Sequence, residues 1–261
     1  MSPPAPRLPP AAAGFRHARL DALRGLALVW MAAYHFCFDL NHFGIIRQNF
    51  HADPLWTLQR TAIVSLFLFT AGVGQVLAVQ GGQGWPRFGR RWAQIAGCAA
   101  LVSLGSWWMF PRSWISFGVL HGMAVMLLAV RALLMTRTLR GTGAWLLGLM
   151  LIAVTPLLGH WAGTQAPPAL AAALDSRWLN GLGVITHKPI TEDYVPLLPW
   201  LGVMLLGVGA AQALPAAWLR RPVGRIGRGL ALLGRHSLTV YMLHQPVLIG
   251  ALMLWRMMAG I

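Results

Sequence analysis

Long apolar segments recur along the chain, and short segments rich in Arg, Gly and Pro separate them. Most of the apolar segments are close to the roughly 20 residues that an α-helix needs to cross a bilayer. Backbone polar groups inside a bilayer have to be satisfied within the protein, which favours helices. The pattern therefore predicts an all-α polytopic membrane helix bundle with about seven transmembrane helices. The expected helices cover residues 20–45, 57–79, 92–110, 114–135, 144–162, 196–213 and 230–255.

The composition agrees with a membrane location. Hydrophobic residues make up 57% of the chain and charged residues 10%, whereas soluble domains carry about 25% charged residues. The chain therefore cannot cover a soluble surface. Residues 1–19 are Pro-rich and then basic, lack the short apolar core of a cleavable signal, and are expected to form a cytoplasmic tail. Residues 20–261 are expected to form a single transmembrane domain.

The distribution of basic residues predicts the orientation. The net charge is +15, but the 21 Lys and Arg residues lie in small clusters between apolar segments, which argues against a nucleic-acid partner. With the N-terminus in the cytoplasm, 14 of the 21 fall in the N-terminal tail and the cytoplasmic loops. The positive-inside rule therefore favours an N-in, C-out topology. The longest loop, residues 163–195, then lies outside, and such loops often hold binding residues.

The two cysteines do not indicate a disulfide or a metal centre. Cys37 and Cys98 both lie inside apolar segments, and neither belongs to a CxxC pair. No metal is therefore expected.

Ionisable residues form a stripe on the first expected helix. At about 100° per residue, five of them fall within an arc of roughly 60°. These are Asp21, Arg24, His35, Asp39 and His42. Burying such groups in lipid is costly, so the stripe has to face protein or water. Asp39 follows His35 by four residues, and its carboxylate is expected to accept from the imidazole and orient it. A hydrogen-bonded seam between helices is the purely structural alternative.

Polar residues elsewhere match this stripe. On the last expected helix Ser237, Tyr241 and His244 share one face. The fourth helix and the outer loop add His121, Glu192 and Asp193. We expect an outer cluster suited to proton transfer, made of His35, Asp39, His121 and His244. A ring of arginines at the cytoplasmic mouth would suit a polyanionic donor. Its members are Arg24, Arg90, Arg91, Arg225, Arg228 and Arg235.

Five segments taken together resemble a known family. They are LDALRGLALVWMAAYHFCFDL, FLFTAG, ISFGVLHG, DYVPLLPWLGV and LGRHSLTVYMLHQPVL. In this order, from about residue 16 to residue 250, they look like the bacterial members of the heparan-alpha-glucosaminide N-acetyltransferase family. The ten residues between Arg24 and His35 are also similar in spacing to the signature of the inner-membrane O-acyltransferases that decorate polysaccharides.

The resemblance implies acetyl transfer across a cell inner membrane by a multi-pass protein. The donor would be acetyl-CoA, bound from the cytoplasm. The acceptor would be an extracytoplasmic glycan or another small molecule with an amine or hydroxyl group. The residues that match motifs of the two families are Arg24, His35, Arg235, His236 and Ser237. The essential histidine of the family's lysosomal member aligns near His51, which leaves His51 as an alternative to His35.

The expected mechanism begins with CoA phosphates on the arginine ring, because Arg–phosphate contacts are strong. Arg24 and His35 lie roughly 16 Å apart along the helix, which an extended pantetheine arm spans. His35 would act as general base or carry the acetyl group, with Asp39 holding its tautomer. His244 or Tyr241 would stabilise the oxyanion. The expected donor-binding residues are Arg24, Arg90, Arg91, Arg235, His236, Ser237 and Tyr241, and the expected acceptor-binding residues are His51, His121, Glu192 and Asp193.

Two other functions stay open from the residues alone. A haem or electron-transfer protein would use two of His35, His121 and His244 as axial ligands, and the purified protein would be red. A proton-coupled transporter would use the same residues as a relay and would not bind CoA. Membrane lipid and a second copy of the chain are further expected partners.

Overall fold

The computed structural model describes residues 17–139 and 141–260, and over these residues the chain forms helices and loops without a strand. The helices are α1 (Ala18–His42), α2 (Pro54–Gln80), α3 (Trp85–Met109), α4 (Val119–Met135), α5 (Thr142–Thr164), α6 (Pro168–Asp175), a 3₁₀ turn (Asn180–Leu182), α7 (Leu197–Ala213), α8 (Ala216–Arg220), α9 (Arg225–Arg235) and α10 (Ser237–Ala259). The all-helical prediction is confirmed. The expected N-terminal tail lies outside the described residues as far as residue 16, and α1 begins two residues after that point.

Six of the expected helices correspond to α1, α2, α3, α4, α5 and α7. Two of their starting points differ from the prediction by five residues or more. α3 begins at Trp85 and not at residue 92, because Gly84 precedes the helix and Pro86 lies in its first turn. α4 begins at Val119 and not at residue 114, because the backbone just before it hydrogen-bonds with residues of the outer loop.

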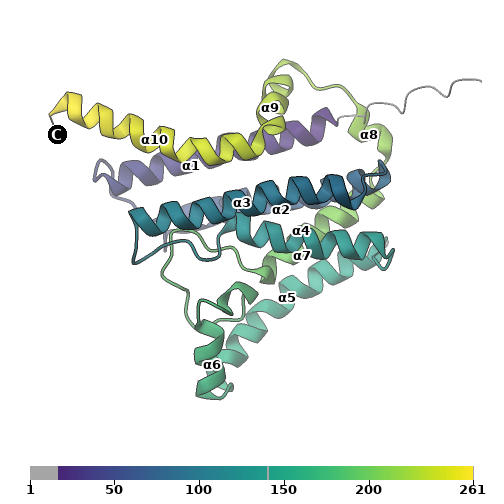
Figure 1. The fold of residues 1–261 in the computed structure, drawn as a ribbon, viewed down its shortest axis with the longest axis horizontal. Coiled ribbons are helices and arrows are strands. Elements are labelled where there is room, and N and C mark those ends of the chain that lie inside the picture. The colour runs from purple at the N-terminus through teal and green to yellow at the C-terminus, as the bar shows by residue number, and fades with distance from the viewer. Residues whose placement is uncertain (1–16, 140, 261) are drawn as a thin grey trace, which may run out of the picture.

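The seventh expected helix, residues 230–255, is wrong at its start. α9 ends at Arg235 and α10 begins at Ser237, with His236 between them at φ −103° and ψ 27°. α9 packs on α1 so closely that a Cβ added to Gly234 would lie 1.8 Å from the carbonyl oxygen of Asp21. α10 also contacts α1 and continues in a different direction from α9 (Figure 1). One straight helix cannot follow both directions, so the chain turns at His236.

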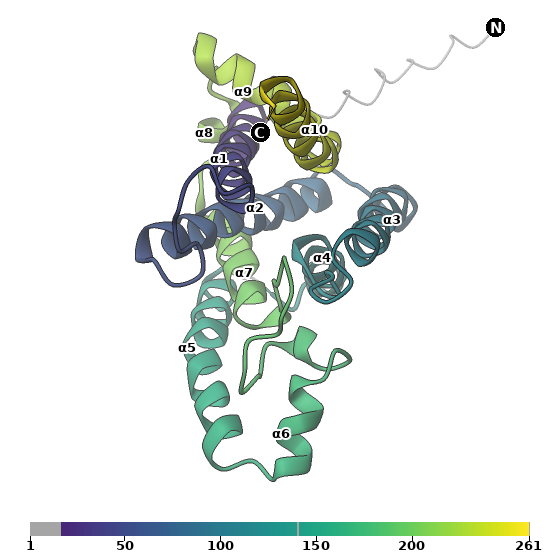
Figure 2. The same ribbon diagram turned by 90° about the vertical axis from the view of Figure 1, so that its left-hand side faces the viewer.

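α2 and α7 lie at the centre of the bundle. α5 packs on α7, α3 packs on α4, and α1 packs on α2, α9 and α10. Figure 2 shows α3 and α4 on one side of the central pair and α5 on the other. Gly72 and Gly207 allow the central pair to approach, because a Cβ on either would lie about 2 Å from a carbonyl oxygen of the opposite helix. Such small residues are typical of helix contacts in membranes.

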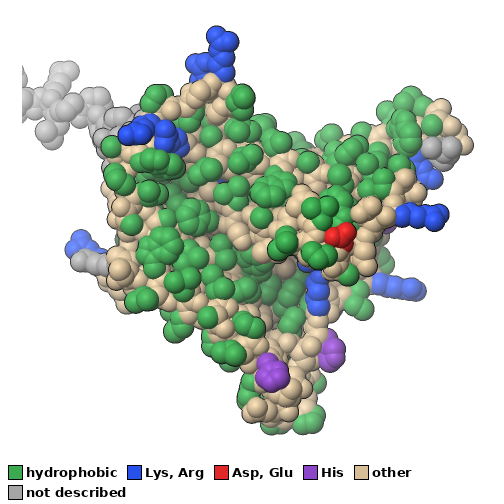
Figure 3. All heavy atoms as spheres, turned by 180° about the vertical axis from the view of Figure 1, so that it is seen from behind, with side chains coloured by type: hydrophobic (Ala, Val, Ile, Leu, Met, Phe, Trp, Pro, Cys, Tyr) green, Lys and Arg blue, Asp and Glu red, His purple; other side chains and the backbone are tan. Residues whose placement is uncertain are grey.

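Apolar side chains cover much of the face shown in Figure 3. Trp108 is 83% exposed and Met257 is 80% exposed. α2, α5 and α10 are long and apolar enough to cross a membrane, and α4 and α7 are apolar but 17 residues long. An exposed apolar surface on long apolar helices indicates a membrane protein. The number of spans and the orientation remain predictions.

Candidate active site

Two histidines from opposite ends of the chain meet between α1 and α10. Nδ1 of His35 lies 2.7 Å from Nε2 of His244. The two rings are stacked, with centroids 4.9 Å apart and planes 20° from parallel. The structure thus brings together two of the residues that the sequence placed in one outer cluster.

The partners of His244 fix the tautomers of both rings. Nδ1 of His244 lies 2.6 Å from the backbone carbonyl oxygen of Tyr241. A carbonyl oxygen only accepts, so this nitrogen carries the hydrogen and Nε2 of His244 is an acceptor. Nδ1 of His35 therefore donates to it, and the hydrogen-free nitrogen of neutral His35 is Nε2. The chain of hydrogen bonds leaves Nε2 of His35 without a hydrogen.

The expectation that Asp39 orients His35 is wrong in this structure. Oδ1 of Asp39 accepts a hydrogen bond of 2.7 Å from Nε2 of Gln245 on α10. Asp39 is 3% exposed, and its other carboxylate oxygen has no hydrogen-bond partner in the structure. His244 and not Asp39 therefore holds the His35 ring, because α10 presents both His244 and Gln245 to α1.

Aromatic rings pack beside the histidine pair. The ring of buried Tyr34 lies 5.9 Å from that of His35 and contacts Phe50 and Trp56 edge-on. Phe50 belongs to the loop after α1, and its burial anchors that loop over the end of the helix. His51 follows Phe50 but is exposed. Among the described residues, no hydrogen bond or ring contact joins the His51 side chain to the pair, so the structure places His51 outside it.

Arg24 lies near the other end of the α1 stripe. Its guanidinium donates to Oδ1 of Asp21 at 3.3 Å and to the carbonyl oxygen of Thr70 on α2 at 3.4 Å. Gly74 leaves the space for it, because a Cβ there would lie 2.4 Å from Nη2 of Arg24. Oδ2 of Asp21 lies 3.9 Å from Nε of Arg235 on α9. Asp21 therefore connects two arginines from different helices.

The remaining predicted donor residues lie near this end or on α10. Arg90 and Arg91 are exposed on α3, and Arg91 acts electrostatically on Arg24. His236 is exposed at the α9–α10 turn, and Ser237 is the first residue of α10. The backbone carbonyl oxygen of Tyr241 accepts a hydrogen bond from Nδ1 of His244, so Tyr241 lies beside the histidine pair.

His121 does not join the histidine pair. Its Nδ1 accepts from the backbone N–H of Gly118 at 3.3 Å, and its Nε2 lies 3.0 Å from Oγ of Ser103. Ser103 in turn donates to the carbonyl oxygen of Ile115. Both imidazole nitrogens are thus used at the start of α4 and in its contact with α3. The expected convergence of His121 with His35 and His244 is wrong, because these local partners already satisfy the ring.

Glu192 and Asp193 hold the long loop that the sequence predicts to lie outside, residues 163–195, against the start of α4. Oδ2 of Asp193 accepts from the backbone N–H of Val119 at 2.7 Å, which caps the helix. Glu192 accepts from the hydroxyl of Ser113 at 2.5 Å. Burial raises the pKa of Asp193, although the hydrogen bond from Val119 and the charge of Arg60 oppose the rise. These contacts give both carboxylates a structural role beside any role in acceptor binding.

Arg60 on α2 is a residue that the sequence analysis did not single out. It acts electrostatically on Asp193 and Lys188 in the loop before α7 and on Tyr34 of α1. Burial lowers the pKa of Lys188, and the charge of Arg60 lowers it further. Its only sequence signal is a single arginine at the outer end of an apolar helix, a position that also suits ordinary anchoring.

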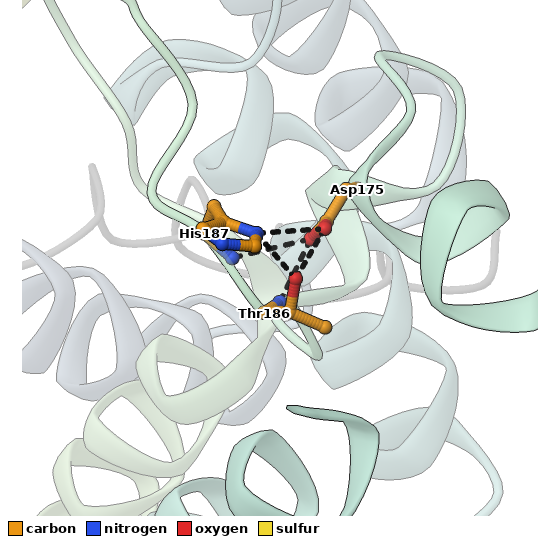
Figure 4. Close-up of polar contacts among 3 residues, drawn as sticks. All are labelled: Asp175, Thr186 and His187. Carbon is orange, nitrogen blue, oxygen red and sulfur yellow. Dashed lines mark hydrogen bonds and ion pairs between the residues drawn. The ribbon is translucent and has the colours of Figure 1, made fainter. Parts of the chain in front are cut away.

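A second polar cluster lies in the outer loop (Figure 4). Oδ1 of Asp175 accepts from the backbone N–H of Thr186 at 2.7 Å, and Oδ2 accepts from the Thr186 hydroxyl and lies 3.4 Å from Nδ1 of His187. Burial alone would raise the pKa of Asp175, but these hydrogen bonds lower it overall. A nucleophilic triad places one imidazole nitrogen on the hydroxyl and the other on the carboxylate. Here Nδ1 contacts both, so the cluster fastens the loop to the end of α6.

No group of three His, Cys, Asp or Glu side chains within residues 17–139 and 141–260 could hold a metal ion.

Comparison with known proteins gives one match. The model of the family described as heparan-alpha-glucosaminide N-acetyltransferase, catalytic, matches residues 16–246. Comparisons with curated proteins and with solved structures return no match.

Proposed function

The chain belongs to the heparan-alpha-glucosaminide N-acetyltransferase family, and we propose that it transfers an acetyl group from cytoplasmic acetyl-CoA to a sugar amine or hydroxyl on the other side of the membrane. The observation that carries this proposal is the His35–His244 hydrogen bond. It leaves Nε2 of His35 as a base on a face of α1 that also carries Arg24. The proton acceptor, Nε2 of His35, and the guanidinium of Arg24 thus lie on the same face of α1.

Donor binding would use the end of the bundle around Arg24. Arg235 shares Asp21 with Arg24, and its side chain is 41% exposed, which leaves it accessible to a phosphate. The exposed Arg90 and Arg91 add positive charge on α3, and His236 and Ser237 lie at the turn beside Arg235. Arg24 and His35 are roughly 16 Å apart along α1, a length that an extended pantetheine arm covers. The thioester would then lie at His35.

In the proposed reaction the acceptor nitrogen or oxygen attacks the thioester carbonyl carbon. The new C–N or C–O bond forms, the C–S bond breaks, and the acceptor proton passes to Nε2 of His35 and then to the CoA thiolate. Nδ1 of His35 keeps its hydrogen bond to His244 throughout, so His244 and the Tyr241 carbonyl stabilise the transient imidazolium.

The histidine pair does not support the haem alternative. Two axial ligands approach the iron from opposite faces of the macrocycle. His35 and His244 hydrogen-bond to each other at 2.7 Å, which leaves no room for iron between these nitrogens. A proton-coupled transporter remains a second candidate, because the same pair forms a short proton relay inside the bundle.

The experiment is acetyl transfer by the purified chain reconstituted in vesicles, with acetyl-CoA outside or inside and glucosamine or a polysaccharide on the opposite side. His35→Ala should lower the transfer rate by about 10²- to 10⁴-fold, as expected for loss of a general base. Arg24→Ala should first raise KM for acetyl-CoA. His160→Ala is the matched control, since His160 is exposed on α5.

If folded His35→Ala protein transfers acetyl at the wild-type rate, His35 is not the general base. If His51→Ala protein has meanwhile lost acetyl transfer, His51 in the loop after α1 is the base instead. Acetyl-CoA-independent proton flux with no CoA release would favour the transporter. Radiolabel retained after acetyl-CoA alone by the wild-type protein, and not by His35→Ala, would show that His35 carries the acetyl group.

A further inference from the structure

A groove opens between α1, α8 and α9, at the end of α1 that carries Arg24. Its volume is about 420 Å³. Arg19, Leu23 and Leu26 of α1 form one wall, and Trp218, Val223 and Leu230 form the other. The interior is therefore largely apolar, and the functional site described above uses none of these side chains.

The groove lies on the opposite side of α1 from the polar stripe. Arg19, Leu23 and Leu26 recur every three or four residues and share one face of the helix. At about 100° per residue, that face is rotated by roughly 140° from the face of Arg24 and His35. Val29 and Phe36, which are 46% and 42% exposed, lie further along α1 but are rotated by roughly 90–100° from the groove face. The groove thus opens away from the proposed donor path.

The rim of the groove is basic. The Arg19 guanidinium stacks over the Trp218 ring at 4.8 Å. Arg221, Arg225 and Arg228 are exposed on the α8–α9 linker and on α9. Within the part of the chain that the structure describes, no acidic side chain forms an ion pair with any of these four arginines, and nearby Asp21 pairs with Arg24 and Arg235. A negative group in the groove would meet uncompensated positive charge.

α9 has the character of a helix that lies in a membrane interface. Gly227, Leu230 and Gly234 face α1 or the groove. Ile226 is 83% exposed and Leu232 is 58% exposed, among exposed arginines. Exposed apolar and basic side chains on one short helix are typical of interfacial helices, and Trp218 beside it has the amphipathic ring found at that depth.

We propose that this groove binds an anionic phospholipid of the surrounding membrane. The headgroup phosphate contacts Arg19 and its basic neighbours on the rim, and one acyl chain lies against Leu23, Leu26 and Leu230. An apolar lining and a basic rim match the two parts of such a lipid. A second copy of the chain fits less well, because a symmetric contact would bring the same arginines together. Acetyl-CoA fits less well as occupant, because Arg24 and His35 lie on another face of α1.

The test uses the purified full chain in neutral detergent with phosphatidylglycerol or phosphatidylcholine added, read by native mass spectrometry for bound lipid and by melting temperature. Phosphatidylglycerol should bind and stabilise, and phosphatidylcholine should do so much less. The double variant Arg19→Gln/Arg221→Gln should bind phosphatidylglycerol about tenfold more weakly, from the loss of two basic contacts. Arg47→Gln/Arg112→Gln is the matched control, since both arginines are exposed in loops elsewhere.

A second variant, Leu23→Trp, fills the groove without changing charge and should lower binding of both lipids. Equal binding of the two lipids, or equal loss in the control, would overturn the proposal. So would displacement of phosphatidylglycerol by inorganic phosphate at equal concentration, or a groove found occupied by a second copy of the chain. None of these outcomes depends on acetyl transfer, so the lipid site and the proposed function fail or succeed separately.

Discussion

Nδ1 of His35 and Nε2 of His244 lie 2.7 Å apart although 209 positions separate the two residues. The contact joins the first described helix to the last, and the Tyr241 carbonyl oxygen completes the chain of hydrogen bonds. α10 otherwise packs loosely, because Leu252 is its only buried residue among those described. The histidine contact is therefore one of the features that hold α10 to α1, and it ties the chemistry of His35 to the position of α10.

The first prediction concerns His244. His244→Ala frees the His35 ring to adopt either tautomer and removes the acceptor that disperses its positive charge. We expect acetyl transfer to fall by about 10- to 100-fold, less than for loss of the base itself. The pH–rate profile should also shift, which a purely structural role would not produce. His160→Ala should leave the transfer rate and the pH–rate profile unchanged. If His160→Ala lost as much activity, the effect of His244→Ala would not come from the histidine pair.

The second prediction concerns the Asp39–Gln245 hydrogen bond. Gln245→Leu leaves a buried carboxylate without its donor, and we expect the free energy of unfolding to fall by about 1–3 kcal/mol. Replacing both partners, as Asp39→Leu/Gln245→Leu, should cost less than the single change, because no orphaned polar group remains. Additive losses in melting temperature would show that the two side chains do not interact.

The third prediction concerns the contact of α1 with α9. Gly25→Ala would place a Cβ 1.9 Å from the Leu230 carbonyl oxygen, so the helices have to separate. We expect a loss of about 1–3 kcal/mol, measured by thermal or denaturant unfolding in detergent. Gly97→Ala on α3 is the control, because its Cβ would meet nothing within 4 Å. Equal effects of the two substitutions would contradict the close packing at Gly25.

The fourth prediction concerns pH and Asp175. Its hydrogen bonds lower the pKa below the ordinary value of 3.8. A lowered pKa means that the carboxylate stabilises the folded loop above pH 3.8 and that this contribution is lost as pH falls through the lower folded value. Asp175→Asn should therefore melt a few degrees below wild type at neutral pH, with the gap closing below pH 3.8.

The control for Asp175 is Asp53, which caps α2 by accepting from the backbone N–H of Leu55. Asn caps helices about as well as Asp, so Asp53→Asn should change the melting temperature little. A gap between Asp175→Asn and wild type that stays constant down to pH 3 would contradict the sign of the shift.

The fifth prediction concerns topology. A cysteine at Trp178, which is 94% exposed in the outer loop, should react with an impermeant thiol reagent added to intact cells. A cysteine at Arg137, in the loop between α4 and α5, should react only after the membrane is opened. Both variants need Cys37→Ser and Cys98→Ser as background. The reverse pattern would invert the orientation and place the donor end on the wrong side.

Several features followed from the sequence because their causes are local. Six of the seven apolar segments that predicted helices correspond to single helices, and the seventh is divided at His236. Long apolar segments favour helices because backbone polar groups in a bilayer have to be satisfied within the protein. The alignment of Arg24 and His35 on one face of α1 follows from the 3.6-residue period alone. The motifs of the first and last helices also indicated the family that the comparison then showed.

Other features depended on partners far along the chain, and only the tertiary structure decided them. Asp39 lies one turn from His35, but Gln245, 206 positions away, takes its carboxylate. His121 and Asp193 looked like site residues, yet Gly118, Ser103 and Val119 use their hydrogen-bonding groups. The break at His236 arises because α9 packs on α1 through Gly25 and Gly234. The face of a helix on which a side chain lies follows from its position in the sequence, whereas its partner depends on which helix packs against that face.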